Sequence, residues 1–98
     1  MTAYKNCTPN ELDYTVVKGG KTTISVNGKD IVLTFEDIPA PPKYMDIKIF
    51  FVPKHVMASI IINAYLKNDT DNLDINKKVK EKLANCINTA ARNRFGLI

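Results

Sequence analysis

Residues 22–35, TTISVNGKDIVLTF, restrict the fold more than any other stretch because they have the pattern of a β-hairpin. Asn27 and Gly28 both tolerate a positive φ, which the type I′ turn of a two-residue hairpin requires. Pairing across this turn places Ile24 opposite Ile31. The side chains that then share the expected core face are Thr22, Ile24, Val26, Lys29, Ile31, Leu33 and Phe35.

The residues before the hairpin predict another strand. Residues 13–17, DYTVV, are rich in the β-branched and aromatic side chains that strands favour, and the Gly-Gly pair at 19–20 would link them to the hairpin. Whether Val16 or Val17 faces inward depends on whether this pair forms a tight turn or a bulge, and both alternatives stay open. The apolar residues of 1–12 follow neither a helical nor a strand period, and we expect this stretch to form an irregular N-terminal arm.

The residues after the hairpin predict a connector and a further strand. Residues 38–45 contain three prolines, each of which fixes φ and removes a backbone donor, so we expect an extended Pro-rich connector. Residues 46–52, DIKIFFV, alternate as a strand with Ile47, Ile49 and Phe51 on one face. The hairpin and its neighbours therefore predict an antiparallel sheet of three to four strands.

Residues 54–67 fit a helix that begins after Pro53, a residue favoured in the first turn. On a helical wheel their polar side chains occupy a narrow arc, which predicts a helix buried on most sides. The polar positions are Ser59, Asn63 and Lys67, and the apolar positions are Met57, Ala58, Ile60, Ile61, Ala64 and Tyr65.

A second helix is expected from Ile75, with Asp74 as its N-cap and Gly96 placed to end it. Arg94 would fall on the apolar side of this helix, so we expect regular helix to stop by about Asn93. Its apolar positions occupy one third of the wheel and are Ile75, Val79, Leu83, Cys86, Ile87 and Ala90.

The element order ββββαα predicts an α+β fold, with the two C-terminal helices packed on one face of the antiparallel sheet. The chain has 98 residues, 45% of them hydrophobic, which suffices for one core but not for two, so residues 1–98 are expected to form a single domain. No apolar run approaches the roughly 20 residues that span a bilayer, and no signal-peptide pattern is present. We therefore expect a cytoplasmic protein, located in the host cell if it is viral.

Residues suited to catalysis or metal binding are sparse. His55 is the only histidine, and Cys7 and Cys86 are the only cysteines, so neither a multi-imidazole metal site nor a disulfide framework is expected. A Ser/His/Asp set would have to use His55, and the Gly-Gly pair at 19–20 lacks the spacing of phosphate-binding loops. The sequence thus predicts no enzymatic activity, no metal and no cofactor.

The positive charge lies in the second half of the chain. The net charge is +4; residues 1–52 carry six lysines and six acids, whereas residues 53–98 carry eight basic groups and four acids. Four of these lysines fall in the first turns of the C-terminal helix, where the helix dipole disfavours each cation by about 0.3–1 kcal/mol. This placement indicates attraction of an anionic partner. Alternatively, these lysines only form the solvated face of the helix, and Glu81 on the same face would repel phosphate.

The expected partner-binding residues combine this basic face with an arginine and aromatic tail of the kind enriched at binding hot spots. Alternatively, Phe95 and Leu97 fold back to close the core. The expected set is Lys77, Lys78, Lys80, Lys82, Asn85, Asn88, Arg92, Arg94 and Phe95.

Three hypotheses for function follow. The first is a non-enzymatic interaction protein that binds an acidic protein partner, such as a phage or mobile-element regulator or inhibitor of a host protein complex. The second is direct nucleic-acid binding by the same helix, which lacks an aromatic stacking platform before Phe95. The third is a self-assembling subunit, a homodimer formed through Tyr14, Val16 and Val32 on the outer sheet face. A membrane partner is not expected.

Overall fold

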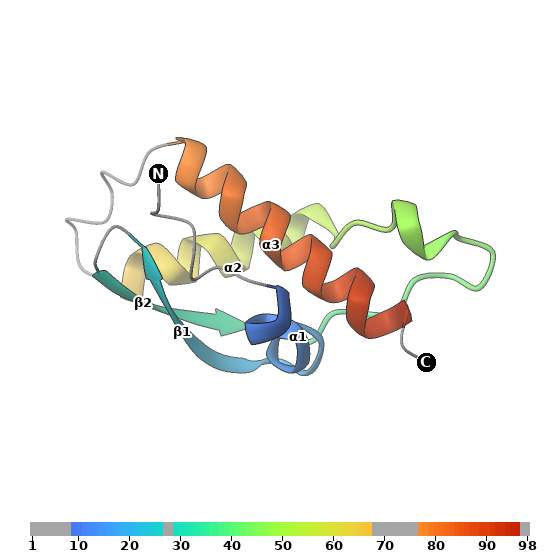
Figure 1. The fold of residues 1–98 in the computed structure, drawn as a ribbon, viewed down its shortest axis with the longest axis horizontal. Coiled ribbons are helices and arrows are strands. Elements are labelled where there is room, and N and C mark those ends of the chain that lie inside the picture. The colour runs from blue at the N-terminus through green and yellow to red at the C-terminus, as the bar shows by residue number, and fades with distance from the viewer. Residues whose placement is uncertain (1–8, 27–28, 68–76, 97–98) are drawn as a thin grey trace.

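The computed structural model describes residues 9–26, 29–67 and 77–96. These residues form an α+β fold, as expected, but their sheet has two antiparallel strands where three to four were predicted. In chain order the elements are α1 (Pro9–Lys18), β1 (Gly20–Val26), β2 (Lys29–Phe35), the 3-10 helix η2 (Ile47–Ile49), α2 (Lys54–Lys67) and α3 (Lys77–Gly96), as Figure 1 shows.

The hairpin has the predicted register. Ile24 pairs with Ile31 and Thr22 pairs with Leu33, while the turn at 27–28 lies outside the described residues. A two-stranded hairpin is marginally stable on its own, so this one depends on the helices that cover it: α2 packs against β2, and α1 contacts both strands. The buried side chains of the hairpin are Ile24, Ile31, Leu33 and Phe35.

The strand predicted at residues 13–17 is wrong, because this stretch belongs to helix α1. Leu12 and Val16 lie four residues apart, on one face of the helix, and both are fully buried. Val17 is only partly buried, so Val16 is the inward-facing residue of the pair. Burial of this helical face outweighs the β propensity of the individual residues.

The ends of α1 explain why the chain is helical here. The helix begins at Pro9, whose fixed φ suits a first turn, so residues 9–12 do not belong to an irregular arm. It ends at Gly19, which has a φ of +76° and donates its N–H to the Thr15 carbonyl at 2.9 Å. L side chains rarely adopt this φ, and a Cβ at Gly19 would also lie 3.2 Å from the Phe35 carbonyl oxygen and 2.7 Å from the Asp37 carboxylate, so this helix end favours glycine.

The strand predicted at residues 46–52 is also wrong. Its first part is the short helix η2, where the Asp46 side chain accepts a hydrogen bond from the Lys48 N–H at 2.9 Å. This local capping bond competes with strand formation, as Asp side chains commonly do. The following residues run extended to Pro53 without entering the sheet.

Burial alternates only over the last four residues of this segment. Ile49 and Phe51 are each 63% exposed, whereas Phe50 and Val52 are buried. Of the three residues expected on one face, Ile47, Ile49 and Phe51, only Ile47 packs against the core, because the segment contacts α3 through Phe50 and Val52.

The C-terminal helix continues past its predicted end. We expected it to stop by about Asn93, but α3 runs to Gly96, and its expected start at Asp74 and Ile75 lies outside the described residues. Arg94 stays helical on the apolar side because its guanidinium reaches α1, 5.6 Å from the centre of the Tyr14 ring. A cation–π contact thus accommodates a charge that the helical wheel placed near the core.

The hydrophobic core joins the hairpin, the helices and residues 50–52. α2 packs on β2, but α3 packs mainly against α1, so the prediction that both C-terminal helices pack on one sheet face is wrong for α3. α2 and α3 contact each other much less than either contacts these neighbours. Figure 1 shows α3 crossing in front of α2.

Candidate functional site

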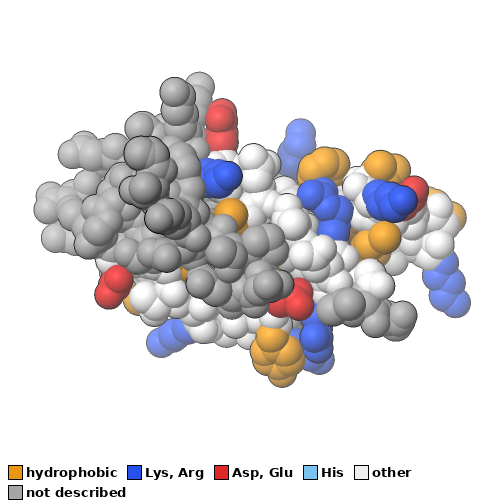
Figure 2. All heavy atoms as spheres, in the orientation of Figure 1, with side chains coloured by type: hydrophobic (Ala, Val, Ile, Leu, Met, Phe, Trp, Pro, Cys, Tyr) orange, Lys and Arg blue, Asp and Glu red, His pale blue; other side chains and the backbone are white. Residues whose placement is uncertain are grey.

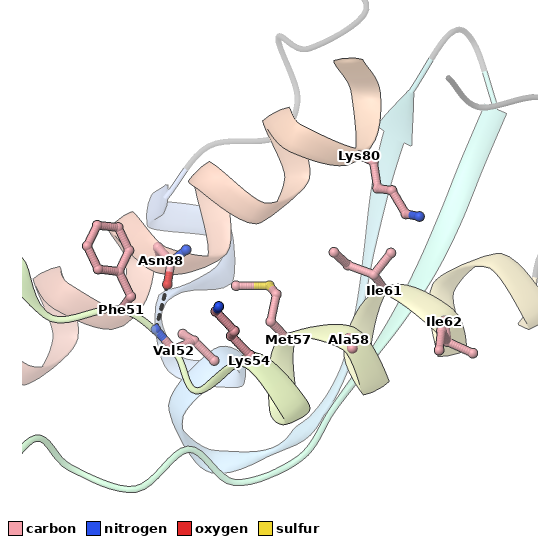
Figure 3. A pocket seen from close by; sticks show the side chains of 9 residues that line it. All are labelled: Phe51, Val52, Lys54, Met57, Ala58, Ile61, Ile62, Lys80 and Asn88. Atoms are coloured by element: carbon pink, nitrogen blue, oxygen red, sulfur yellow. Dashed lines mark hydrogen bonds between the residues drawn. The ribbon is translucent and has the colours of Figure 1, made fainter. Parts of the chain in front are cut away.

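A groove between α2 and α3 is the candidate functional site. Its volume is about 520 Å³, which falls in the range of roughly 300–1,000 Å³ usual for ligand sites. Figure 3 shows that side chains of both helices and of residues 51–52 surround it. The residues lining the groove are Phe51, Val52, Lys54, Met57, Ala58, Ile61, Ile62, Lys80 and Asn88.

The wall formed by α2 arises because this helix is apolar on two sides. Val56, Ile60 and Ala64 face the core, at positions four residues apart. The next side chains around the helix face the groove, where Ile61 is nearly buried but Ile62 is 54% exposed. The prediction that α2 is buried on most sides is therefore wrong, since part of its apolar surface faces solvent.

Opposite α2, residues 51–52 and α3 form the other wall of the groove. Polar side chains of α3 hold this segment in place by hydrogen bonds to the backbone of residues 50–52. The Val52 N–H donates to the Asn88 side-chain oxygen at 2.6 Å, and the Arg92 guanidinium donates to the Phe50 carbonyl at 3.0 Å. Asn88 and Arg92 lie one helical turn apart, so they contact successive parts of the extended segment. These bonds satisfy backbone groups that a neighbouring strand would otherwise pair, which explains the extended but unpaired conformation.

Two aromatic contacts fix the direction of the phenylalanines. The Phe50 ring points inward and meets Phe95 edge to face, with centroids 5.5 Å apart and an interplanar angle of 89°. The Phe51 ring points the other way and lies beneath the Arg92 guanidinium, 5.0 Å from its centroid. Phe51 thereby forms one end of the groove while remaining mostly exposed.

The charged side chains that line the groove are both positive. Lys54 is the first residue of α2, and Lys80 projects from the first turns of α3 near Ile61, as Figure 3 shows. No aspartate or glutamate occurs among the nine lining residues that the structure describes. The groove therefore combines an apolar surface with two lysines, side chains of the sign that attracts anionic groups.

The structure divides the predicted partner-binding residues among several places. Lys80 and Asn88 line the groove. Lys82 and Asn85 are exposed on α3 but do not line it. The side chains of residues 77–78 (Lys77 and Lys78) lie outside the described part, so their predicted role stays a prediction.

The predicted C-terminal tail is part of the packed structure. Arg92 binds the Phe50 carbonyl, Arg94 lies over Tyr14, and Phe95 packs on Phe50. Each of these side chains is half-buried. The prediction of a projecting arginine and aromatic tail is wrong for these three residues, and the alternative that Phe95 closes the core is confirmed.

The sequence prediction missed the main apolar residues of the site, Phe51 and Ile62. A signal was present in the run Ile60-Ile61-Ile62, because three successive helical residues span about 200° and cannot all face one core. The complementary signal was the Phe50-Phe51 pair, whose rings must point to opposite sides of an extended segment.

A second group of exposed apolar side chains lies around η2. Tyr44 is 89% exposed, and Met45 and Ile49 are also exposed. Figure 2 shows orange hydrophobic atoms mixed with blue Lys and Arg atoms at this end of the molecule. None of these side chains lines the groove, so they provide a comparison surface for it.

The described residues contain no candidate metal-binding cluster. No group of three or more His, Cys, Asp or Glu side chains is arranged there to hold a metal ion. Cys86 is buried in the core and His55 is exposed at the start of α2. Within the same residues, no helix has the length and hydrophobicity needed to cross a membrane.

Comparisons with protein-family models, with curated proteins and with solved structures gave no match to this chain.

Proposed function

We propose that this chain is a non-enzymatic interaction protein that binds an acidic, partly apolar segment of a protein partner in the groove between α2 and α3. The observation that carries the proposal is the groove itself, which combines exposed Phe51 and Ile62 with two lysines and, among the lining residues that the structure describes, no carboxylate. A regulator or inhibitor of a larger complex would use such a surface, because docking alone suffices for its action.

The exposed apolar area can supply useful binding energy. Fully burying a large apolar side chain contributes about 1.5–3 kcal/mol. Ile62 is 54% exposed and Phe51 is 63% exposed, so covering either contributes about half of that value, roughly 1–1.5 kcal/mol. Loss of one such contact should weaken binding by about five- to tenfold.

Direct nucleic-acid binding by the same helix has less support. Arg92 and Asn88, which would contact phosphates or bases, instead bind the backbone of residues 50–52. The groove floor is apolar, whereas a nucleic-acid interface needs donors directed at phosphate oxygens.

The experiment is affinity capture from cells of the source organism, with and without nuclease, using matched pairs of variants. The groove variants are Ile62→Gln and Lys54→Glu. The controls make the same chemical changes elsewhere: Ile49→Gln on the η2 surface and Lys21→Glu on β1, both at exposed positions.

We expect the same protein to be captured by wild type and by both controls, and its recovery to fall at least about fivefold with either groove variant. Equal recovery with groove and control variants would refute the proposed site. Capture that disappears with nuclease treatment would favour the nucleic-acid hypothesis instead.

A further inference from the structure

We infer that the segment bound in the groove is an amphipathic α-helix of about two turns with acidic residues at its ends. This inference rests on the proposed function and specifies the conformation and charge of the ligand. Three features of the groove support it: its backbone chemistry, its length and its charge.

The backbone chemistry favours a helix over an extended peptide. An extended segment needs partners for its own N–H and C=O groups, which an exposed strand edge supplies in β-addition. The groove is lined mainly by side chains of α2 and α3, whose backbone groups bond within each helix. At its extended wall, the Val52 N–H is already bonded to Asn88 and the Phe50 carbonyl to Arg92. A helical ligand satisfies its own backbone and needs only side-chain contacts.

The length of the groove sets the size of the helix. Its α2 wall extends from Lys54 to Ile62, which corresponds to about 12 Å at 1.5 Å per residue. A bound helix lying along this wall would contact it over about two turns, through apolar residues at positions i, i+4 and i+7. Phe51 and Ile62 at the two ends, with Met57 between them, offer contacts for three such anchors.

The lysines of the groove favour a bound helix that has acidic residues at its ends. Lys54 lies beside the Phe51 end, and Lys80 lies near Ile61 toward the other end. Glutamates or aspartates that flank the apolar anchors would approach these ammonium groups. A ligand with lysines in the same positions would be repelled at both ends.

The test is selection of binders from a displayed library of random 16-residue peptides, with counter-selection against the Ile62→Gln variant. Enriched sequences are then synthesised, and their affinities are measured by fluorescence anisotropy. We expect enrichment of peptides with apolar residues at i, i+4 and i+7 and with flanking acids. A proline in the centre of such a peptide should lower its affinity at least about tenfold, and Lys54→Glu should lower it about fivefold.

Several results would overturn the inference. These are enrichment of alternating or proline-containing extended peptides, enrichment of basic peptides, and failure to enrich any peptide over the counter-selected variant. Formation of a homodimer that Ile62→Gln dissociates, measured by sedimentation, would also overturn it, because a second copy of the chain would then occupy the groove.

The two proposals fail in different ways. If partner capture depends on Ile62 and Lys54 but an extended peptide competes best, the proposed function stands and the helical ligand is wrong. If capture is insensitive to the groove variants, the proposed function is wrong whatever the peptides do.

Discussion

Replacing Asn88 with leucine should destabilise the fold and disrupt the end of the groove. The Asn88 side-chain oxygen accepts the Val52 N–H at 2.6 Å in a partly buried position. Leucine has a similar size but no acceptor, so the Val52 N–H would lose its partner while remaining shielded from water. Residues 50–52 would then be held mainly by Arg92 and by packing of Phe50 on Phe95.

The magnitude combines two opposing effects. An unsatisfied buried backbone donor costs about 1–3 kcal/mol. Leucine is a better helix former than asparagine by up to about 0.5 kcal/mol, and position 88 is inside α3. The Asn88→Leu variant should therefore lose about 0.5–2.5 kcal/mol of unfolding free energy.

The assay is urea unfolding followed by circular dichroism, with Asn88→Asp as the matched control. Aspartate keeps an acceptor at the same place, and it lies one helical turn from Arg92, so its stability should stay within about 0.5 kcal/mol of wild type. If leucine matched wild type, or if aspartate lost as much stability as leucine, the assigned role of Asn88 would be refuted.

Three other changes test separate parts of the structure. Lys54→Glu places an acid in the first turn of α2, which has no acid there. It should raise the free energy of unfolding by about 0.3–1 kcal/mol in urea titration, although it weakens partner capture. A loss of stability would contradict this expectation. Gly19→Ala should cost about 1 kcal/mol or more in thermal unfolding, because of its φ of +76° and its approach to Asp37. Gly96→Ala, with only an ordinary contact at 3.9 Å, should be neutral or slightly stabilising, and equal losses at both glycines would refute the distinction. Leu12→Ala should cost about 2–5 kcal/mol in urea unfolding if α1 buries this side chain, and a loss below about 0.5 kcal/mol would indicate an unpacked arm instead.

Local signals were sufficient for the hairpin and for most of the C-terminal helix. Asn27-Gly28 predicts a register in which Ile24 meets Ile31, and the structure has that pairing. In α3, the apolar positions Leu83 and Ile87 are buried as predicted. In both elements the hydrophobic period agrees with the local signals for that type of structure, so tertiary contacts did not alter the predicted secondary structure.

The two wrong strands show what local patterns omit. Residues 13–17 have strand propensity, but the helix-start residue Pro9 and the helix-ending Gly19 lie outside that window, and they delimit α1. Residues 46–52 have the alternation of a strand, but they lie outside the sheet, and Val52 is instead held by Asn88 in α3, 36 positions away in the chain. Long-range hydrogen bonds of this kind leave no local pattern in either segment.

The site was only partly predictable, because it too depends on long-range contacts. Lys80 and Asn88 were expected to bind a partner, and they do line the groove. Their apolar counterparts, Phe51 and Ile62, stay exposed because α3 packs mainly on α1 and makes few contacts with α2. Helical wheels describe the faces of each helix but not the angle between two helices.

The most direct test of the central claim is an amide chemical-shift map of the protein bound to its captured partner. We predict that the largest changes fall on α2 residues 54–62 and at Lys80 and Asn88, with little change in the hairpin. Changes concentrated on residues 44–49 or on the hairpin, with the groove amides unaltered, would contradict the claim that this groove is the binding site.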